Sequence, residues 1–357
     1  MSVAARWLAA ACALAACGDA LADLDVTWPG CSRSRQGATM EVVQPGQTNT
    51  HVTGIHLNEC NFKTVNLESL RAYPNVKDIE LSNINVTNIT ALTFDSFTDL
   101  QLLTMEKNSI LGKNLPSDLF RKCRRLNYIN FKDNDMRDTP ADLMQGLDLT
   151  TLFLHNCNLK EVPSFFTSQM FPHMDYFVTD HNEISKIHPT TFANAVSLTT
   201  LSLSYNRIKY LHVDLLKPLT KIRWIYLDNN KLLHIPEALF QHNPSLEYVN
   251  LSHNQIKNIP SNAFLGTNLK ELYLNDNRLT HLPQKFIINL HSTGISLNIF
   301  HFHGNPWECA YLNKLLVMIK KFKIRYDSSQ YNGHHQACTY KKLLAPMIIH
   351  EKAEIEN

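Results

Sequence analysis

The stretch Leu198-Thr-Thr-Leu-Ser-Leu-Ser-Tyr-Asn-Arg-Ile208 decides the fold of this chain. Its pattern, L-x-x-L-x-L-x-x-N-x-L, returns at 222–232 and at 246–256. Weaker copies begin at Val52, Val76, Leu100, Leu126, Leu149, Met174, Leu269 and Leu297. Eleven units of 23 to 28 residues therefore follow one another, and a fixed period of this kind is typical of a solenoid built from stacked repeats.

Each position of the repeat has a physical role. The L-x-L pair predicts a short strand whose alternate side chains point into the coil, and strands of neighbouring coils should stack as a curved parallel sheet. The asparagine turns the chain inward and can bond backbone groups that the turn leaves unpaired. The expected ladder is Asn108, Asn134, Asn182, Asn206, Asn230, Asn254, Asn277 and Asn305, with Ile84, Cys60 and Cys157 in the same slot of other units. Phe94, Phe120, Phe192, Leu216 and Phe240 should fill the opposite, convex side of the core.

The ends of a solenoid need caps, because a terminal coil otherwise exposes its apolar side. We expect a signal peptide at 1–22, an N-terminal cap at 23–51, repeats at 52–306, a C-terminal cap at 307–350 and a tail at 351–357. Cys31 could reach Cys60 in the first coil. A bridge between Cys309 and Cys338 would close the C-terminal cap over a Lys-rich helix at about 310–323. Cys123 and Cys157 should be buried and free.

The leader indicates export. Arg6, an apolar run and the small residues before Asp23 have the order of a secretory signal, and no later segment is apolar for long enough to span a membrane. A rival interpretation is a bacterial lipoprotein box ending at Cys17. Asn85, Asn88 and Asn250 begin glycosylation sequons. We therefore expect a secreted, extracellular protein.

The repeats and the sequence Asn305-Pro-Trp-Glu-Cys309 resemble animal extracellular leucine-rich-repeat proteins with a cysteine-flanked C-terminal cap. Within them the chain most resembles the secreted leucine-rich-repeat immune proteins of mosquitoes and related insects. The resemblance implies a role in innate immunity, with ligands such as complement-like thioester proteins or microbial surface molecules. Better-known members carry a coiled coil after the cap; only 19 residues without heptads follow Cys338, so the match is to a coil-less member and leaves the oligomeric state open.

Aromatic residues recur on the solvent side of the predicted sheet. Tyrosine and tryptophan dominate the energetics of protein interfaces, so we expect a ligand-binding face there, centred on Trp224, Tyr226 and Tyr248. Its candidate residues are Tyr128, Phe153, Tyr176, Tyr205, Trp224, Tyr226, Tyr248 and Tyr273. Plain strand propensity of aromatic residues is the competing explanation. A glycan on Asn250 would stand among these side chains, so we expect either an empty sequon or a ligand confined to units 4 to 8.

Other chemistries have little support in the sequence. His301 and His303 share one strand face, and His155, His181 and His253 occupy predicted solvent-facing slots, but two histidines are too few for a zinc site and no metal is expected. No nucleophile-elbow, P-loop or dinucleotide motif is present, so we expect neither an enzyme nor a cofactor. The net charge of +2 gives no general attraction to nucleic acid, and the basic run at 121–125 is interpreted as a solvated loop rather than a polyanion site.

Three functions remain compatible with the sequence. The leading hypothesis is a non-catalytic recognition protein that binds an extracellular protein or a microbial surface ligand through the sheet. The second is a structural or adhesion component of the extracellular matrix, and the third is a receptor ectodomain or decoy.

Overall fold

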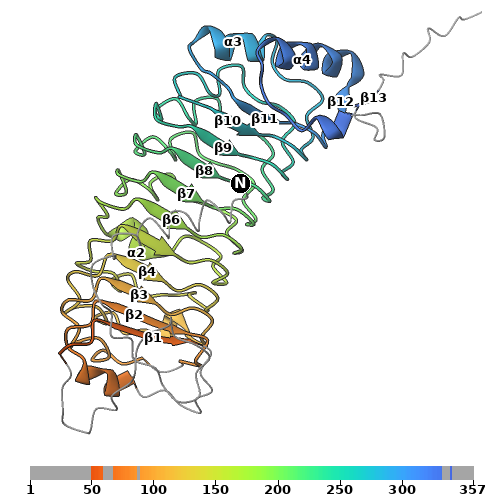
Figure 1. Ribbon diagram of the computed structural model, residues 1–357. Coiled ribbons are helices and arrows are strands. Elements are labelled where there is room, and N and C mark those ends of the chain that lie inside the picture. Colours follow the sequence, from red (N-terminus) through yellow and green to blue (C-terminus); the bar gives the residue numbers. More distant parts are fainter. Residues whose placement is uncertain (1–49, 59–66, 87–88, 332–337, 340–357) are drawn as a thin grey trace, which may run out of the picture.

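The chain forms a curved solenoid of eleven stacked coils (Figure 1). In this computed structural model the described residues are 50–58, 67–86, 89–331 and 338–339. Each coil contributes one strand, and β1 to β11 pair in sequence order as one parallel sheet. The predicted parallel-sheet horseshoe is therefore confirmed. The expected signal peptide, residues 23–49 of the expected N-terminal cap, residues 332–337 and 340–350 of the expected C-terminal cap, the expected tail at 351–357, and Cys31, Cys60 and Asn88 lie outside the described residues.

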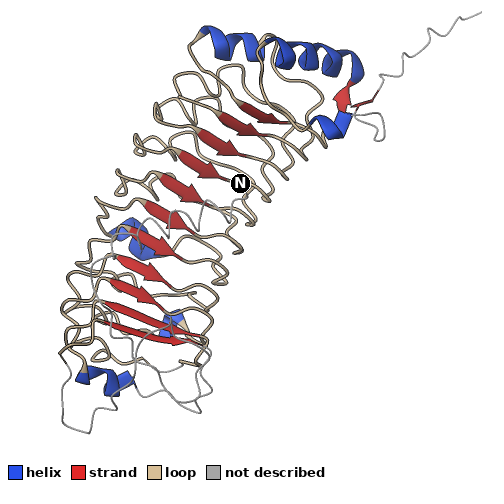
Figure 2. Ribbon diagram, in the orientation of Figure 1, coloured by secondary structure: helices blue, strands red, loops and turns tan. Residues whose placement is uncertain are grey.

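The strands are short and regularly spaced, while loops and a few brief helices form the other side of the coils (Figure 2). The sheet strands are β1 Gly54–Asn58, β2 Asp78–Ser82, β3 Leu102–Thr104, β4 Tyr128–Asn130, β5 Thr151–Phe153, β6 Tyr176–Val178, β7 Thr200–Ser202, β8 Trp224–Tyr226, β9 Tyr248–Asn250, β10 Glu271–Tyr273 and β11 Ile299–His301. The helices are η2 Leu67–Ala72, η3 Gly112–Asn114, α2 Ser164–Ser168, α3 Phe286–Ser292, α4 Cys309–Lys321 and η4 Ser328–Tyr331. A small second sheet pairs β12 Trp307–Glu308 with β13 Cys338–Thr339.

The asparagine ladder is present. The Nδ2 group of Asn206 donates to the carbonyls of Thr179 (2.9 Å) and Leu203 (3.1 Å), and its Oδ1 accepts from the N–H of Ile184 (2.9 Å). These bonds link a coil to the one before it, so every ladder amide satisfies backbone groups that the inward turn removes from water. Asn108, Asn134, Asn182, Asn230, Asn254, Asn277 and Asn305 make the same kinds of bond. At Ile84, which occupies the asparagine slot of the second unit, the backbone N–H donates to Asn108 Oδ1 at 3.2 Å.

The convex side of the core is filled as expected. Phe94, Phe120, Phe192, Leu216 and Phe240 are each at most 2% exposed. Neighbouring rings contact one another from coil to coil, for example Phe94 and Phe120 with centroids 5.6 Å apart and Phe240 and Phe264 at 5.3 Å. Cys123 and Cys157 are buried and free, as predicted. Burial raises the pKa of both thiols to about 12, so they are unreactive near neutral pH.

The C-terminal cap closes as the sequence indicated. A disulfide joins Cys309 and Cys338, whose Cα atoms are 4.9 Å apart. Trp307 is completely buried, and its indole N–H donates to the Phe302 carbonyl at 2.8 Å. Helix α4 covers the last coil beside α3, beginning one residue before and ending two residues before the expected bounds (Figure 1). No helix within the described ranges has the length and apolar character needed to cross a membrane.

Candidate functional site

We call the solvent side of the eleven-stranded sheet the concave face. Within each three-residue strand, β3 to β11, the middle residue points into the coil and the two flanking residues point to this face, so one coil offers two strand positions. Ile225, for example, is fully buried between Trp224 and Tyr226 in β8. Parallel strands stack about 4.8 Å apart, so equivalent side chains of adjacent coils contact one another.

Four aromatic rings form a continuous row across β8 to β11, which we call the ring ladder. The ring centroids of Tyr226 and Tyr248 are 4.8 Å apart, and those of Tyr248 and Tyr273 are 5.2 Å apart. Tyr273 then stacks almost parallel on His301 at 4.7 Å. Trp224 lies beside this ladder, and the guanidinium of Arg223 sits 4.3 Å from the centre of its ring. The structure thus brings four of the eight predicted aromatic residues into one cluster, together with His301.

The other four predicted residues lie farther along the sheet. Tyr128 and Phe153 form a separate pair, with centroids 5.7 Å apart, and Tyr176 begins β6. Tyr205 lies just beyond β7, where its ring stacks on His181 at 4.1 Å with 9° between the planes. Burial raises the pKa of Tyr128 to about 12 and also raises that of Tyr176. Because β7 offers only Thr200 and Ser202, the aromatic surface is interrupted there.

Two of the predicted residues are not solvent-exposed. Tyr226 is 3% exposed and Tyr248 is 5% exposed, whereas Trp224 and Tyr273 are partly exposed and Tyr205 is 47% exposed. Contacts between neighbouring rings of the ring ladder account for part of this burial. Tyr226 and Tyr248 therefore act as the floor of the cluster, and Trp224 and Tyr273 are its accessible members.

Asn250 was expected in an exposed slot and is only 6% exposed. Its Nδ2 group donates to Asp228 Oδ1 at 3.0 Å, and its Oδ1 accepts from the Ser252 hydroxyl at 2.7 Å. N-glycosylation modifies this same nitrogen, so the geometry favours the expectation of an empty sequon. Asn85, in contrast, is exposed.

A polar stripe lies beside the ring ladder, and reasoning from the sequence did not predict it. Asp180, Ser204, Asp228 and Ser252 occupy the same repeat position in four consecutive coils, directly after Thr179 in the first and after a leucine in the other three, and each is buried. Ser204 bridges the two acids, with its N–H 3.0 Å from Asp180 Oδ1 and its hydroxyl 2.6 Å from Asp228 Oδ1. The signal that could have found this stripe is the spacing of 24 residues between its members.

Burial also governs the titration of this stripe and its neighbours. The pKa of Asp180 rises to about 7, first because the carboxyl is removed from water and then because Asp228 is close, although bonds from Ser202 and Ser204 oppose the rise. Burial lowers the pKa of His155 to about 4, and nearby His181 adds to the effect. His155, expected in an exposed slot, is half-buried against His181, with ring centroids 4.7 Å apart.

Charged groups border the ring ladder on the side away from the polar stripe. Glu247 accepts from Arg223 at 3.0 Å and pairs with Lys270 at 3.2 Å, and these two cations lower its pKa against the opposing effect of burial. The three side chains span three consecutive coils. The surface around Trp224 therefore combines aromatic rings with an arginine, and both residue types are enriched at protein interfaces.

The described histidines near the sheet lie beside acidic and aromatic side chains. His253 and His303 place Nε2 atoms 3.4 Å and 3.9 Å from Asp276 Oδ2, and the rings of His301 and His303 are 6.1 Å apart. Among the residues that the structure describes, no group of three His, Cys, Asp or Glu side chains is arranged to hold a metal ion. The basic run at 121–125 is partly neutralised, since Arg121 pairs with Asp95 at 2.6 Å and Arg125 with Asp99 at 2.9 Å.

Known proteins share the repeat sequence. Rabbit (Oryctolagus cuniculus) lumican is 29% identical over 157 residues, which make up 43% of this chain and 77% of that sequence. Mouse (Mus musculus) keratocan is 25% identical over 150 residues, covering 39% of this chain and 42% of keratocan. The chain also spans less than half of human lumican, 44% of its length.

Solved structures share the fold. A leucine-rich-repeat protein of Leptospira interrogans superposes with a TM-score of 0.65 at 18% identity, covering 78% of this chain and 72% of that one. A chain of the Drosophila Toll–Spatzle complex superposes with a TM-score of 0.56 at 19% identity, covering 72% of this chain and 42% of that one. Similarity at these identities concerns the fold alone.

Two family models match the repeats themselves. The model described as Leucine rich repeat matches residues 172–232 and 220–279, and the model described as BspA type Leucine rich repeat region matches residues 48–139. Both matches fall on the coils that carry the parallel strands and the asparagine ladder. The chain belongs to the leucine-rich-repeat proteins.

Proposed function

We propose that this protein is a secreted, non-catalytic recognition protein that binds an extracellular protein or a microbial surface ligand through the concave face. The observation that carries the proposal is the cluster over β8 to β11, where partly exposed Tyr273 packs on the buried ring of Tyr248 and partly exposed Trp224 lies opposite Tyr248 on the neighbouring strand. Aromatic side chains held rigid by their neighbours lose little conformational entropy on binding, so they are effective anchors for a partner.

A role in innate immunity is the finer form of this proposal. It rests on the resemblance of the sequence to insect immune leucine-rich-repeat proteins. Export is proposed from the leader sequence, whose residues lie outside the described part of the chain. In this form the ligand is a complement-like protein or a molecule of a microbial surface.

A matrix or adhesion protein is the alternative, and one observation favours it. The chain is similar to lumican and keratocan over 150 residues or more, a similarity that covers about two fifths of its length. Both functions use a protein-binding sheet, so the identity of the partner separates them.

Affinity capture from extracellular fluid tests the proposal. Secreted wild-type protein is compared with Trp224→Ala, which removes a partly exposed ring, and with Tyr210→Ala, which removes an exposed ring outside the sheet strands. A partner retained by wild type and by Tyr210→Ala but lost by Trp224→Ala supports recognition through the concave face. Equal capture by all three proteins contradicts it.

The captured partner then decides the finer assignment. A thioester-type protein or a microbial surface molecule supports immunity, whereas a fibrous matrix protein supports the alternative. Circular dichroism of each variant is the control for folding.

A further inference from the structure

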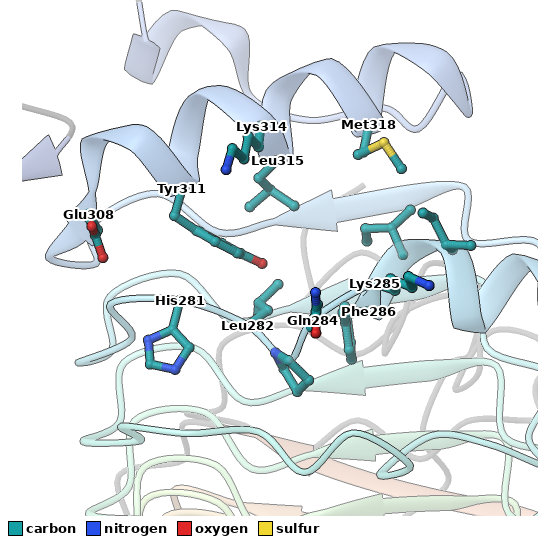
Figure 3. A pocket seen from close by; sticks show the side chains of 13 residues that line it. His281, Leu282, Gln284, Lys285, Phe286, Glu308, Tyr311, Lys314, Leu315 and Met318 are labelled. Carbon is teal, nitrogen blue, oxygen red and sulfur yellow. The ribbon is translucent and has the colours of Figure 1, made fainter.

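A groove separates α3 from α4 at the C-terminal end of the solenoid (Figure 3). It has a volume of about 590 Å³, within the range of protein ligand pockets. Leu282, Phe286 and Leu315 are buried along it, and the partly buried side chains of Tyr311 and Met318 project from α4 toward it (Figure 3).

The groove continues along the seam between the two helices. A second hollow of about 290 Å³ shares Ile287 with the first and reaches Phe322 and Ile324 beyond the end of α4. Helix α4 has 13 residues, so the seam runs for about 20 Å at 1.5 Å per residue. An elongated groove of this kind, largely apolar in the first hollow and mixed with polar side chains such as His291 and Asn298 in the second, suits an extended chain better than a compact molecule.

Positive charge surrounds this seam. Lys285 and Lys314 line the first hollow, and Lys320, Lys321 and Lys323 follow at its far end. Helices α3 and α4 contain no Asp or Glu, and Glu308 is the one carboxylate among the described lining residues of the two hollows. A suitable occupant is therefore apolar along most of its length and acidic at the end near Lys320.

The chain itself contains a segment with this chemistry. Residues 343–349 read Leu-Leu-Ala-Pro-Met-Ile-Ile, and residues 351–356 read Glu-Lys-Ala-Glu-Ile-Glu. Residues 340–357 lie outside the described part of the chain, so the inference uses only their sequence and their point of attachment. Seven extended residues span about 23 to 25 Å, which is close to the length of the seam.

The point of attachment lies beside the groove. Strand β13 ends at Thr339, which is paired with Glu308 in β12, and Glu308 lines the groove. Paired strands are about 4.8 Å apart, so residue 343 needs to cross only a short distance to reach the first hollow. Residue 351 would then arrive near the lysines that end α4.

We propose that segment 343–356 of this chain binds the groove between α3 and α4. Its apolar residues occupy the seam, and its glutamates pair with Lys320, Lys321 and Lys323. This contact would cover the apolar seam of the cap, and it is independent of recognition by the concave face. A membrane surface fits less well, because Val317 is the one large apolar side chain of α4 that is exposed.

Native methionines report the contact directly. Met318 lines the groove, Met347 lies in the segment, and Met170 is 65% exposed and serves as an internal reference. Hydrogen peroxide oxidation of the secreted full chain is followed by mass spectrometry, with a synthetic peptide of residues 340–357 as the undocked standard. We expect Met347 to oxidise about tenfold more slowly in the protein than in the peptide, which corresponds to a docked fraction of about nine tenths.

A matched pair of variants tests the position of the contact. Ile288 lines the groove and is 38% exposed, whereas Val317 is 65% exposed and does not line it. We expect Ile288→Asp to return Met347 to the rate of the peptide and Val317→Asp to leave it slow. Glu354→Lys with Glu356→Lys, which leaves the cap untouched, should speed oxidation of Met347 several-fold. Oxidation of wild-type Met347 at the peptide rate, or equal effects of the two aspartates, would overturn the proposal.

Discussion

Substitution of one ladder asparagine tests how the coils are held together. Asn230 is 7% exposed, and its Nδ2 group donates to the carbonyl of Leu203 at 2.9 Å while its Oδ1 accepts from the N–H of Ile208 at 3.0 Å. In Asn230→Ala the Leu203 carbonyl keeps a partner, because Asn206 also donates to it at 3.1 Å. The buried N–H of Ile208 loses the side-chain oxygen that satisfies it.

The expected cost follows from these two bonds. An unpaired buried N–H costs about 1–3 kcal/mol, and the second hydrogen bond contributes about 1 kcal/mol net. We therefore expect the free energy of unfolding of Asn230→Ala to be about 2–4 kcal/mol lower than that of wild type. The assay is urea unfolding followed by circular dichroism. Asn262→Ala, at an exposed position outside the ladder, is the matched control and should change stability by less than about 0.5 kcal/mol.

Cys157, which occupies the asparagine position of its own coil, leads to a more specific prediction. At Cys157 the N–H of Met136 bonds instead to the backbone carbonyl of Cys157 at 3.0 Å, so that loop has adjusted to the shorter side chain. Asn230→Cys lacks this adjustment and should cost nearly as much as Asn230→Ala. Equal stability of Asn230→Ala and Asn262→Ala would refute the assignment of the ladder as the link between coils.

Three further predictions follow from the site and the cap. Burial raises the pKa of Asp180 from an ordinary value near 4 to about 7, so its contribution to stability is greatest below about pH 4 and is lost as the pH rises to 7. Between pH 4 and pH 8, the stability of Asp180→Asn should therefore rise relative to that of wild type by up to about 4 kcal/mol. Equal pH profiles of the two proteins in urea unfolding would contradict this. Peptide mapping of protein secreted by animal cells should find Asn250 unmodified and Asn85 glycosylated, and a glycan on Asn250 would contradict the geometry of its bond to Asp228. Replacing both Cys309 and Cys338 by serine should lower stability by about 3–4 kcal/mol, since the bridge closes 29 residues. Reductant should therefore destabilise wild type more than the variant by about this amount, and an equal effect of reductant on both proteins would argue against this assignment.

The sequence predicts the fold well because each coil repeats the same physical solution. The L-x-L pair and the following asparagine specify a strand and a turn locally, and stacking of equal units then leaves little choice of topology. The bridge of the cap could likewise be inferred from the place of Cys309 after the last ladder position. The ladder cysteine at 157 could be assigned to the interior for the same reason.

The site could be predicted only in part, because accessibility depends on neighbouring coils. The period places Tyr226 and Tyr248 on the solvent side of the sheet, but the ring contacts that contribute to their burial join residues more than 20 positions apart. The same limit applies to Asn250, whose partner Asp228 belongs to the preceding coil. The groove between α3 and α4 depends on how the cap helix packs against the last repeats, which no local pattern specifies.

The affinity of the captured partner tests the central claim most directly. Calorimetric titration of the purified partner against wild type, Trp224→Ala and Tyr210→Ala measures what one concave-face ring contributes. Truncation of an interface anchor costs about 2 kcal/mol or more, so Trp224→Ala should weaken binding by about thirtyfold, while Tyr210→Ala should leave it within about threefold. Unchanged affinity in Trp224→Ala, or an equal loss in Tyr210→Ala, would contradict recognition through the concave face.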